Sequence, residues 1–305
     1  MSELSFDDGV LFFPVSAFDA AGRLDIAATG AHVADGVEAG PGGVFAACGT
    51  GEFHALSLEE FTAVVAASID ATAGRVPVIA GAGGPLGHAI GCARAASEAG
   101  ADGLLLLPPY LVQGPQAGIV RYVEAVLAET DLPVIVYHRG ASTLTAATAE
   151  HLLSLPGVAG IKDGVGDIAV AQQIVLAGQR TGRTDLRFFN GLLTAELSQA
   201  AYKAIGMPLY SSAVFAMAPD IATAFYRAYR ADDADTQRRL LDGFYRPLVA
   251  LRDETPGFAV SLIKAGLRLA GVPVGSVRAP LVDPTPAQEQ RLADILAAGR
   301  SLVPA

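Results

Sequence analysis

Residues 133–162, PVIVYHRGASTLTAATAEHLLSLPGVAGIK, contain two short apolar runs separated by an amphipathic segment. The runs Pro133–His138 and Val158–Lys162 are rich in Val and Ile, which is typical of strands buried on both faces. Between them, Thr145–Leu155 carries apolar residues at helical spacing. The stretch therefore predicts a strand–helix–strand unit whose two strands lie parallel in one sheet.

The same alternation runs along most of the chain. Eight apolar runs recur roughly every 25–35 residues, which is the length of successive strand–helix units. They are Val10–Phe18, Gly43–Cys48, Pro77–Gly83, Gly103–Pro108, Pro133–His138, Val158–Lys162, Leu186–Asn190 and Pro208–Val214. Because eight parallel strands close a barrel, the sequence predicts an α/β fold with a (β/α)8 TIM barrel over residues 1–230.

The pattern changes after the eighth run. Residues 232–299 hold three further helical stretches and no convincing strand, and no linker rich in Ser or Pro precedes them. We therefore expect residues 231–305 to form a C-terminal helical extension packed on the barrel.

Composition and charge exclude several classes of protein and of binding partner. The 305 residues are 51% hydrophobic and 17% charged, a composition that excludes intrinsic disorder. The net charge of −10 argues against nucleic acid or an anionic membrane surface as a partner. The acidic N-terminus lacks the features of a signal peptide, and no run of 18 apolar residues occurs. We expect no membrane segment and a cytoplasmic location.

The sequence predicts no metal site and no dinucleotide site. The two cysteines and five histidines show no ligand spacing. The glycine-rich run Gly81–Gly84 fails the dinucleotide fingerprint, because Leu86 occupies the position of its last glycine, and we interpret the run as a turn.

Lys162 is the sharpest candidate for chemistry. Active sites of such barrels lie at the carboxyl ends of the strands, and Lys162 ends the sixth apolar run. A lysine in a dry barrel mouth has a lowered pKa, so its amine becomes a nucleophile able to form a Schiff base with a ketone. The alternative is a structural ion pair with Asp163 or Asp167, and the position alone leaves both interpretations open.

Other polar residues stand at the same edge of the predicted barrel. Tyr137 could carry protons or simply pack at the rim, and Arg139 could hold a carboxylate or form a surface salt bridge. Thr50 and Gly51 could bind an anion through their loop or form a tight turn. Further candidates at strand ends are Tyr110, Gly191, Ser211 and Ser212.

Several motifs resemble a known superfamily. They are Gly9–Val15 (GVLFFPV), Cys48–Phe53 (CGTGEF), Gly160–Asp167 (GIKDGVGD), Tyr210–Phe215 (YSSAVF) and Pro256–Gly266 (PGFAVSLIKAG). From about Gly9 to Ile295 the chain resembles the dihydrodipicolinate synthase / N-acetylneuraminate lyase superfamily of Schiff-base aldolases and dehydratases. Within that superfamily it is similar to the family of 5-dehydro-4-deoxyglucarate dehydratases.

The resemblance implies roles for individual residues. Lys162 matches the Schiff-base lysine, and Tyr137 matches the tyrosine that relays protons over the imine. Thr50 matches the second threonine of the synthases' Gly-Thr-Thr-Gly-Glu motif. Gly49 replaces the first threonine, which argues against synthase activity. Gly191 matches a glycine whose neighbourhood lines the substrate pocket.

The resemblance also implies a reaction and an assembly. The expected reaction is dehydration and decarboxylation of 5-dehydro-4-deoxyglucarate, a small keto sugar acid, to 2,5-dioxopentanoate without a metal or organic cofactor. Thr50, Arg139 and Ser211 or Ser212 are candidate donors to its carboxylates, and a homotetramer is expected. His138 and Ala216 replace the family's usual asparagines and bear on substrate fit.

Two alternatives stay open at this point. The first is an aldolase acting on another 2-keto-3-deoxy sugar acid, because the same imine supports carbon–carbon cleavage. The second is a barrel that binds ligands without catalysis, although the presence of both Tyr137 and Lys162 argues against it.

Overall fold

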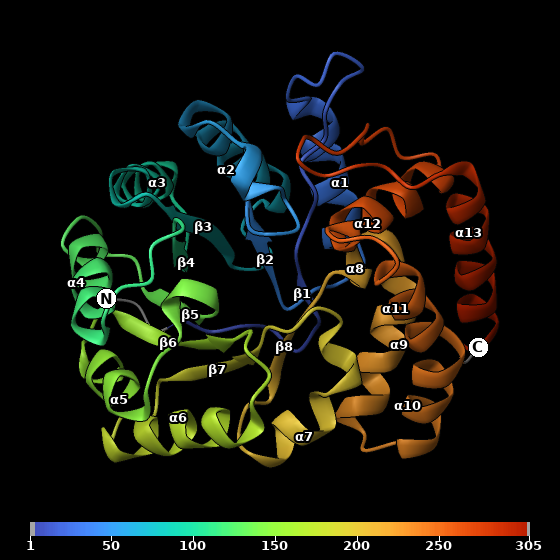
Figure 1. Cartoon of the computed structure of the whole chain (residues 1–305). Helices are drawn as coiled ribbons and strands as arrows, with labels where there is room; N and C mark the ends of the chain where they lie inside the picture. The colour runs from blue at the N-terminus through green and yellow to red at the C-terminus, as the bar shows by residue number, and fades with distance from the viewer. Residues whose placement is uncertain (1–3, 304–305) are drawn as a thin grey trace.

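The computed structural model describes residues 4–303, and over this range eight parallel strands close into a barrel in chain order (Figure 1). The strands are β1 (Leu11–Phe12), β2 (Gly43–Ala46), β3 (Val78–Gly84), β4 (Gly103–Pro109), β5 (Val134–His138), β6 (Val158–Asp163), β7 (Arg187–Asn190) and β8 (Leu209–Ser212). Strand β1 pairs with both β2 and β8, which completes the ring. The predicted barrel is confirmed.

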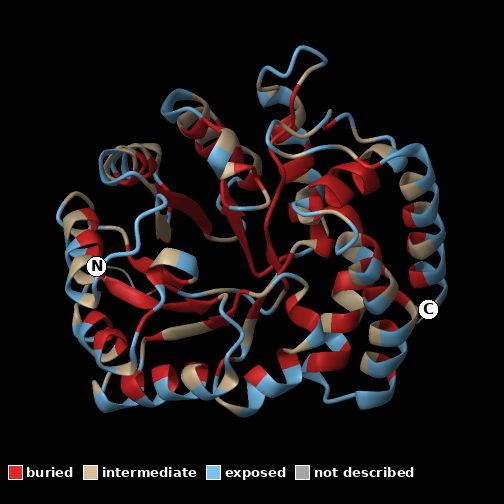
Figure 2. Ribbon diagram, in the orientation of Figure 1, coloured by how far each residue is buried: buried red, intermediate tan, exposed pale blue. Residues whose placement is uncertain are grey.

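Helices follow the strands and cover the outside of the barrel. They are α1 (Ile26–Glu38), α2 (Leu58–Thr72), α3 (Leu86–Ala99), α4 (Gln116–Leu127), α5 (Ala146–Ser154), α6 (Ile168–Arg180), α7 (Gln199–Ala204), α8 (Val214–Met217) and α9 (Pro219–Arg230). Figure 2 shows that the longer helices bury the face turned toward the strands and expose the other, whereas all four residues of α8 are buried. This is the amphipathic pattern of a helix packed on a sheet.

Three helical stretches follow the barrel, as the sequence predicts. The first runs without a break through α10 (Ala234–Leu240), a π-helical turn (Leu241–Tyr245) and α11 (Arg246–Arg252). The others are α12 (Phe258–Leu269) and α13 (Pro286–Ser301). Contacts of α10 and α13 with α9, and of α12 with α8, hold this extension on the barrel. The division of the chain at residue 230 stays a prediction.

The first strand is shorter than expected. The apolar run Val10–Phe18 predicts a strand, whereas β1 spans Leu11–Phe12. Pro14 lies inside the run and has no N–H to donate to the sheet, so hydrogen-bonded pairing stops before it. The rest of the run still packs inside, because Phe13 and Val15 are buried.

The interpretation of Gly81–Gly84 as a turn is wrong, because these residues form the second half of β3. A Cβ at Gly81 would lie 2.5 Å from the carbonyl oxygen of Ala47, and one at Gly83 would lie 2.6 Å from Cβ of Leu107. The glycines therefore let β3 lie close to the chain on either side of it.

Aromatic and aliphatic side chains fill the interior of the barrel. Phe13 and Phe45 stack with ring centroids 4.5 Å apart, and Ile135 and Phe189 belong to the same buried cluster. This packed layer forms an apolar floor beneath the carboxyl ends of the strands.

Candidate active site

Strand pairing places Tyr137 and Lys162 side by side. The two residues are partners in the register of β5 and β6, and both side chains are buried. Successive side chains of a strand point to opposite faces, so their neighbours His138 and Asp163 point away from the barrel interior. Asp163 there accepts hydrogen bonds from the backbone N–H of Val165 and from the Tyr202 hydroxyl.

The amine of Lys162 lies in an apolar environment. Its Nζ is 4.1 Å from the ring centroid of Phe13 and 4.8 Å from that of Tyr137. Burial is the main cause that lowers its pKa to about 7, with a smaller contribution from the positive charge of Arg139. Lys162 forms no ion pair within residues 4–303, and the carboxylate of Asp167 instead caps helix α6. The structural alternative, a lysine paired with a neighbouring aspartate, is not what the structure shows.

The hydroxyl of Tyr137 has two fixed partners. It donates a hydrogen bond of 2.7 Å to the carbonyl oxygen of Gly191 and accepts one of 2.9 Å from Nη1 of Arg139. Burial raises the pKa of Tyr137, while the adjacent guanidinium opposes that shift. The phenol is therefore neutral, oriented and next to the lysine, which is the arrangement that proton transfer requires.

Two glycines make room for this pair. A Cβ at Gly191 would lie 2.5 Å from Cε of Lys162, and a Cβ at Gly164 would lie 2.7 Å from Cε2 of Tyr137. Any larger residue at either position would displace a side chain of the pair.

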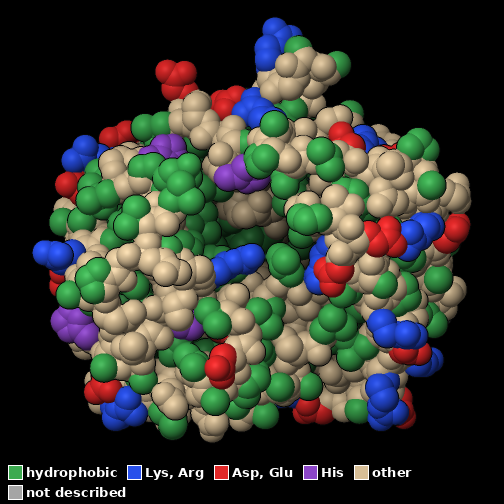
Figure 3. Space-filling model, viewed as in Figure 1, with side chains coloured by type: hydrophobic (Ala, Val, Ile, Leu, Met, Phe, Trp, Pro, Cys, Tyr) green, Lys and Arg blue, Asp and Glu red, His purple; other side chains and the backbone are tan. Residues whose placement is uncertain are grey.

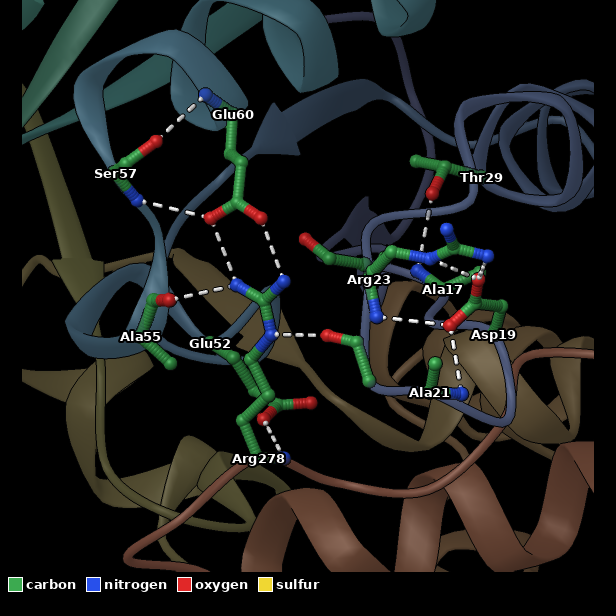
Figure 4. A network of polar contacts seen from close by, with 12 residues as sticks. Ala17, Asp19, Ala21, Arg23, Thr29, Glu52, Ala55, Ser57, Glu60 and Arg278 are labelled. Carbon is green, nitrogen blue, oxygen red and sulfur yellow. Dashed lines mark hydrogen bonds and ion pairs between the residues drawn. The ribbon is translucent and has the colours of Figure 1, made fainter.

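The loop after β2, which carries Thr50, is fastened to the C-terminal extension. Glu52 on this loop accepts a hydrogen bond of 2.8 Å from Nζ of Lys264 on α12, and both side chains are fully buried. Its other carboxylate oxygen accepts the backbone N–H of Arg278, at 2.8 Å. The guanidinium of Arg278 in turn donates to both carboxylate oxygens of Glu60 on α2 (Figure 4). Thr50 is thus positioned by contacts that span most of the chain.

A cavity of about 630 Å³ opens at the carboxyl ends of the strands, between them and the helices α11 and α12. Figure 3 shows it as a hollow with Lys or Arg side chains at its edge. Six of the candidate residues line it: Thr50, Tyr137, Arg139, Lys162, Gly191 and Ser211.

Gly51 and Ser212 are not among the residues that line this cavity, and their contact with the substrate stays a prediction. The carbonyl of Gly51 accepts a hydrogen bond from Ser16, at 2.7 Å. Ser212 alternates with Ser211 along β8, so its hydroxyl faces away from the cavity and donates to the buried carboxylate of Glu196.

The model of the dihydrodipicolinate synthetase family matches residues 7–299, which is nearly the whole chain. The chain belongs to this family. It is 54% identical to a probable 5-dehydro-4-deoxyglucarate dehydratase of Streptomyces griseus, over 97% of this chain and 92% of the relative. A relative of the same description in Azotobacter vinelandii is 44% identical, over 94% of each chain.

Solved structures of the dihydrodipicolinate synthetase family share the fold. Dihydrodipicolinate synthase from Oceanobacillus iheyensis superposes with a TM-score of 0.88 at 22% identity, covering 97% of each chain. The prophage protein YagE of E. coli K12, solved in complex with pyruvate, superposes with a TM-score of 0.83 at 28% identity, covering 96% of this chain and 98% of its own.

Most residues that line the cavity were not among the predicted site residues, and two of them, Phe13 and Arg252, bear on its chemistry. Phe13 lies inside the first apolar run and was assigned only to a strand, although its ring contacts Lys162. Arg252 ends helix α11 in the C-terminal extension, which the strand–helix pattern does not connect to the active-site edge.

Residues 4–303 contain neither a cluster of metal-ligating side chains nor a helix suited to cross a membrane. No cluster of three or more His, Cys, Asp or Glu side chains is placed to hold a metal ion. None of the helices over this range combines the length and apolar character that a membrane span needs.

Proposed function

We propose that the protein dehydrates and decarboxylates 5-dehydro-4-deoxyglucarate through a Schiff base on Lys162. The observation that carries the proposal is the buried amine of Lys162 beside the oriented hydroxyl of Tyr137. This amine has no carboxylate partner among residues 4–303, and its pKa is lowered to about 7. The relatives at 44–54% identity, each described as a probable 5-dehydro-4-deoxyglucarate dehydratase, support the choice of substrate.

The first step is formation of the imine. The neutral amine of Lys162 adds to the C5 ketone, and the resulting carbinolamine loses its oxygen as water to give an iminium ion. The hydroxyl of Tyr137 gives a proton to the departing oxygen and is reprotonated by solvent or substrate.

Dehydration follows from the acidity that the iminium confers on C4. A base, which is Tyr137 or a water molecule that it holds, removes a C4 proton, and the electron pair of that bond forms the enamine. The enamine then expels the C3 hydroxyl, which leaves with a proton as water. The product is an iminium conjugated to the C3–C4 double bond.

Decarboxylation uses the same electron acceptor. The C1–C2 bond breaks, C1 leaves as carbon dioxide, and its electron pair moves through C2, C3 and C4 to the iminium nitrogen. Protonation of the carbon chain and conversion of the C2 enol to an aldehyde follow. Hydrolysis of the imine then releases 2,5-dioxopentanoate and restores Lys162.

The carboxylate next to the ketone needs hydrogen-bond donors. The cavity offers the hydroxyls of Thr50 and Ser211 and the guanidinium of Arg139. Arg139 already donates to Tyr137, so it links this carboxylate to the proton-transfer group.

Product analysis tests the proposal. Incubation with 5-dehydro-4-deoxyglucarate, coupled to a semialdehyde dehydrogenase, should report 2,5-dioxopentanoate. Formation of pyruvate instead would indicate the aldolase. Borohydride reduction with a keto acid should attach the acid to Lys162, and an adduct on Lys203 or Lys264 would refute the assignment.

The homotetramer implied by the resemblance also enters here as a proposal. The loop after β4 exposes Tyr110, Leu111 and Val112, with 63%, 79% and 69% of their surfaces accessible. Three adjacent exposed apolar side chains favour a contact with another subunit. Sedimentation analysis of the protein and of a Leu111→Asp variant would test that contact.

A further inference from the structure

One positive side chain lines the cavity from the C-terminal extension. Arg252, the last residue of α11, lies in this wall, whereas Arg139 and Lys162 line the cavity from β5 and β6. Figure 1 places α11 on a different side of the barrel mouth from those two strands. The cavity therefore presents cations from two separate directions.

The guanidinium of Arg252 is held in place but not saturated. Its Nη1 donates a hydrogen bond of 2.7 Å to Oγ1 of Thr194, on the loop after β7. Its Nε donates one of 2.8 Å to the carboxylate of Asp253. Of the five N–H donors of an arginine, these two have partners within residues 4–303 and three remain for a ligand.

The surroundings strengthen an interaction with an anion. The Arg252 side chain is 16% exposed, whereas its neighbour Asp253 is 60% exposed and therefore well screened by water. The remaining residues of this wall are apolar or glycine and include Leu248, Val260 and Leu281. A carboxylate entering this space would lose water and gain a preorganised, charged donor.

We infer that Arg252 binds the carboxylate at the end of the substrate far from the imine. The inference rests on the proposed function, in which the substrate has a carboxylate at each end and the imine forms next to C6. The group held by Arg252 is then C1, which leaves as carbon dioxide. Arg252 consequently favours the dicarboxylic substrate both over monocarboxylic keto acids and over the product, which lacks that carboxylate.

Two six-carbon keto acids isolate this contact. 2-Oxoadipate has a carboxylate at its far end, and 2-oxohexanoate has a methyl group there; neither has a hydroxyl to eliminate. Calorimetric titration should show that the protein binds 2-oxoadipate more tightly. Arg252→Met should weaken 2-oxoadipate binding by about 10- to 100-fold, the usual effect of losing a charge-assisted hydrogen bond, and leave 2-oxohexanoate unchanged. Arg252→Lys, which keeps the charge but not the fork of donors, should lie between them.

Arg246→Met is the matched control. Arg246 lies on the same helix but is 71% exposed and pairs with Asp242, so its loss should leave both affinities unaltered. If Arg252→Met weakened the binding of both acids equally, Arg252 would have a merely structural role and the inference would be overturned. Failure of the unaltered protein to prefer 2-oxoadipate, or to bind either acid, would also overturn it. Turnover of 5-dehydro-4-deoxyglucarate is measured separately, so failure of the proposed reaction is distinguished from failure of this contact.

Discussion

Gly191 lies against the side chain of Lys162 so closely that the added Cβ of an alanine would come within 2.5 Å of Cε and 2.6 Å of Cγ. The same Cβ would meet the carbonyl oxygen of Asp163 at 2.9 Å, so the backbone as well as the lysine would have to move. The position of the amine in the cavity thus depends on the absence of a side chain at the residue that directly follows strand β7.

Gly191→Ala should therefore impair imine formation more than folding. Overpacking of this kind destabilises a protein by about 1–3 kcal/mol. The yield of adduct trapped by borohydride on Lys162 should fall much further, because the amine is displaced from its place in the cavity. Gly30→Ala on α1 is the control, because a Cβ there meets no atom within 4 Å. Normal trapping in Gly191→Ala would show that the lysine tolerates the collision.

The pH dependence of imine formation should follow the titration of Lys162. Only the neutral amine attacks a ketone, and burial lowers its pKa to about 7. The rate of adduct formation should therefore rise as the pH increases through about 7 and level off above it. A rise centred near pH 10 would mean that the amine is as well hydrated as an ordinary lysine.

Lys162→Met should abolish turnover and make the protein more stable at neutral pH. The folded state disfavours the charged amine, while the unfolded state holds it charged up to a pKa of about 10.4. The unfolded chain therefore binds more protons between these values, so the stability of the natural protein rises with pH across them. The advantage of the variant should be a few kcal/mol at most near pH 7 and should shrink toward pH 10. Thermal midpoints at both pH values would measure it, and an advantage that grows with pH would contradict the lowered pKa.

Tyr137→Phe should separate binding from proton transfer. The ring still packs against Lys162, but the hydroxyl that contacts Gly191 and Arg139 is lost. Turnover should fall by about 10²–10⁴-fold, the usual contribution of a general acid–base group. Borohydride trapping should survive, and stability should fall by about 1 kcal/mol through the lost hydrogen bonds. Near-normal turnover would assign the proton transfer to another group.

Lys264→Met should destabilise the protein because it leaves the carboxylate of Glu52 buried without a cation. The carboxylate of Glu52 would remain fully buried without its cation, a situation that costs about 3–5 kcal/mol. Adding Glu52→Gln should recover much of this loss, because the buried charge is then removed as well. Chemical denaturation of the two single variants and the double variant gives the free energy of unfolding of each. A double variant whose loss of stability equals the sum of the two single losses would contradict a direct interaction between Glu52 and Lys264.

Buried parallel strands explain why so much of the fold could be predicted from the sequence. Strands such as Val134–His138 are buried along their whole length and begin with an unbroken apolar run, so each one is recognisable without its neighbours. The glycines of Gly81–Gly84 were misinterpreted because their role is close packing against other strands, which local sequence does not reveal.

The sequence predicts those residues of the candidate site whose place is set by their position at the end of a strand. Tyr137 and Lys162 end neighbouring strands and meet in register. The sequence does not distinguish Ser211 from Ser212, whereas the alternation of a strand turns only Ser211 toward the cavity. The contribution of Arg252 depends on how the C-terminal helices pack, which no local pattern determines.

The ion pair between Glu52 and Lys264 also sets an order of events during protein synthesis. The two residues are separated by 212 positions, so the loop with Thr50 leaves the ribosome long before its buried partner is made. At about 5–20 residues per second, that interval lasts roughly 10–40 seconds. Throughout it, the carboxylate of Glu52 has no ammonium group to accompany it into the interior. The nascent barrel can pair its strands during this time, but the Thr50 loop takes its final position only after α12 has emerged.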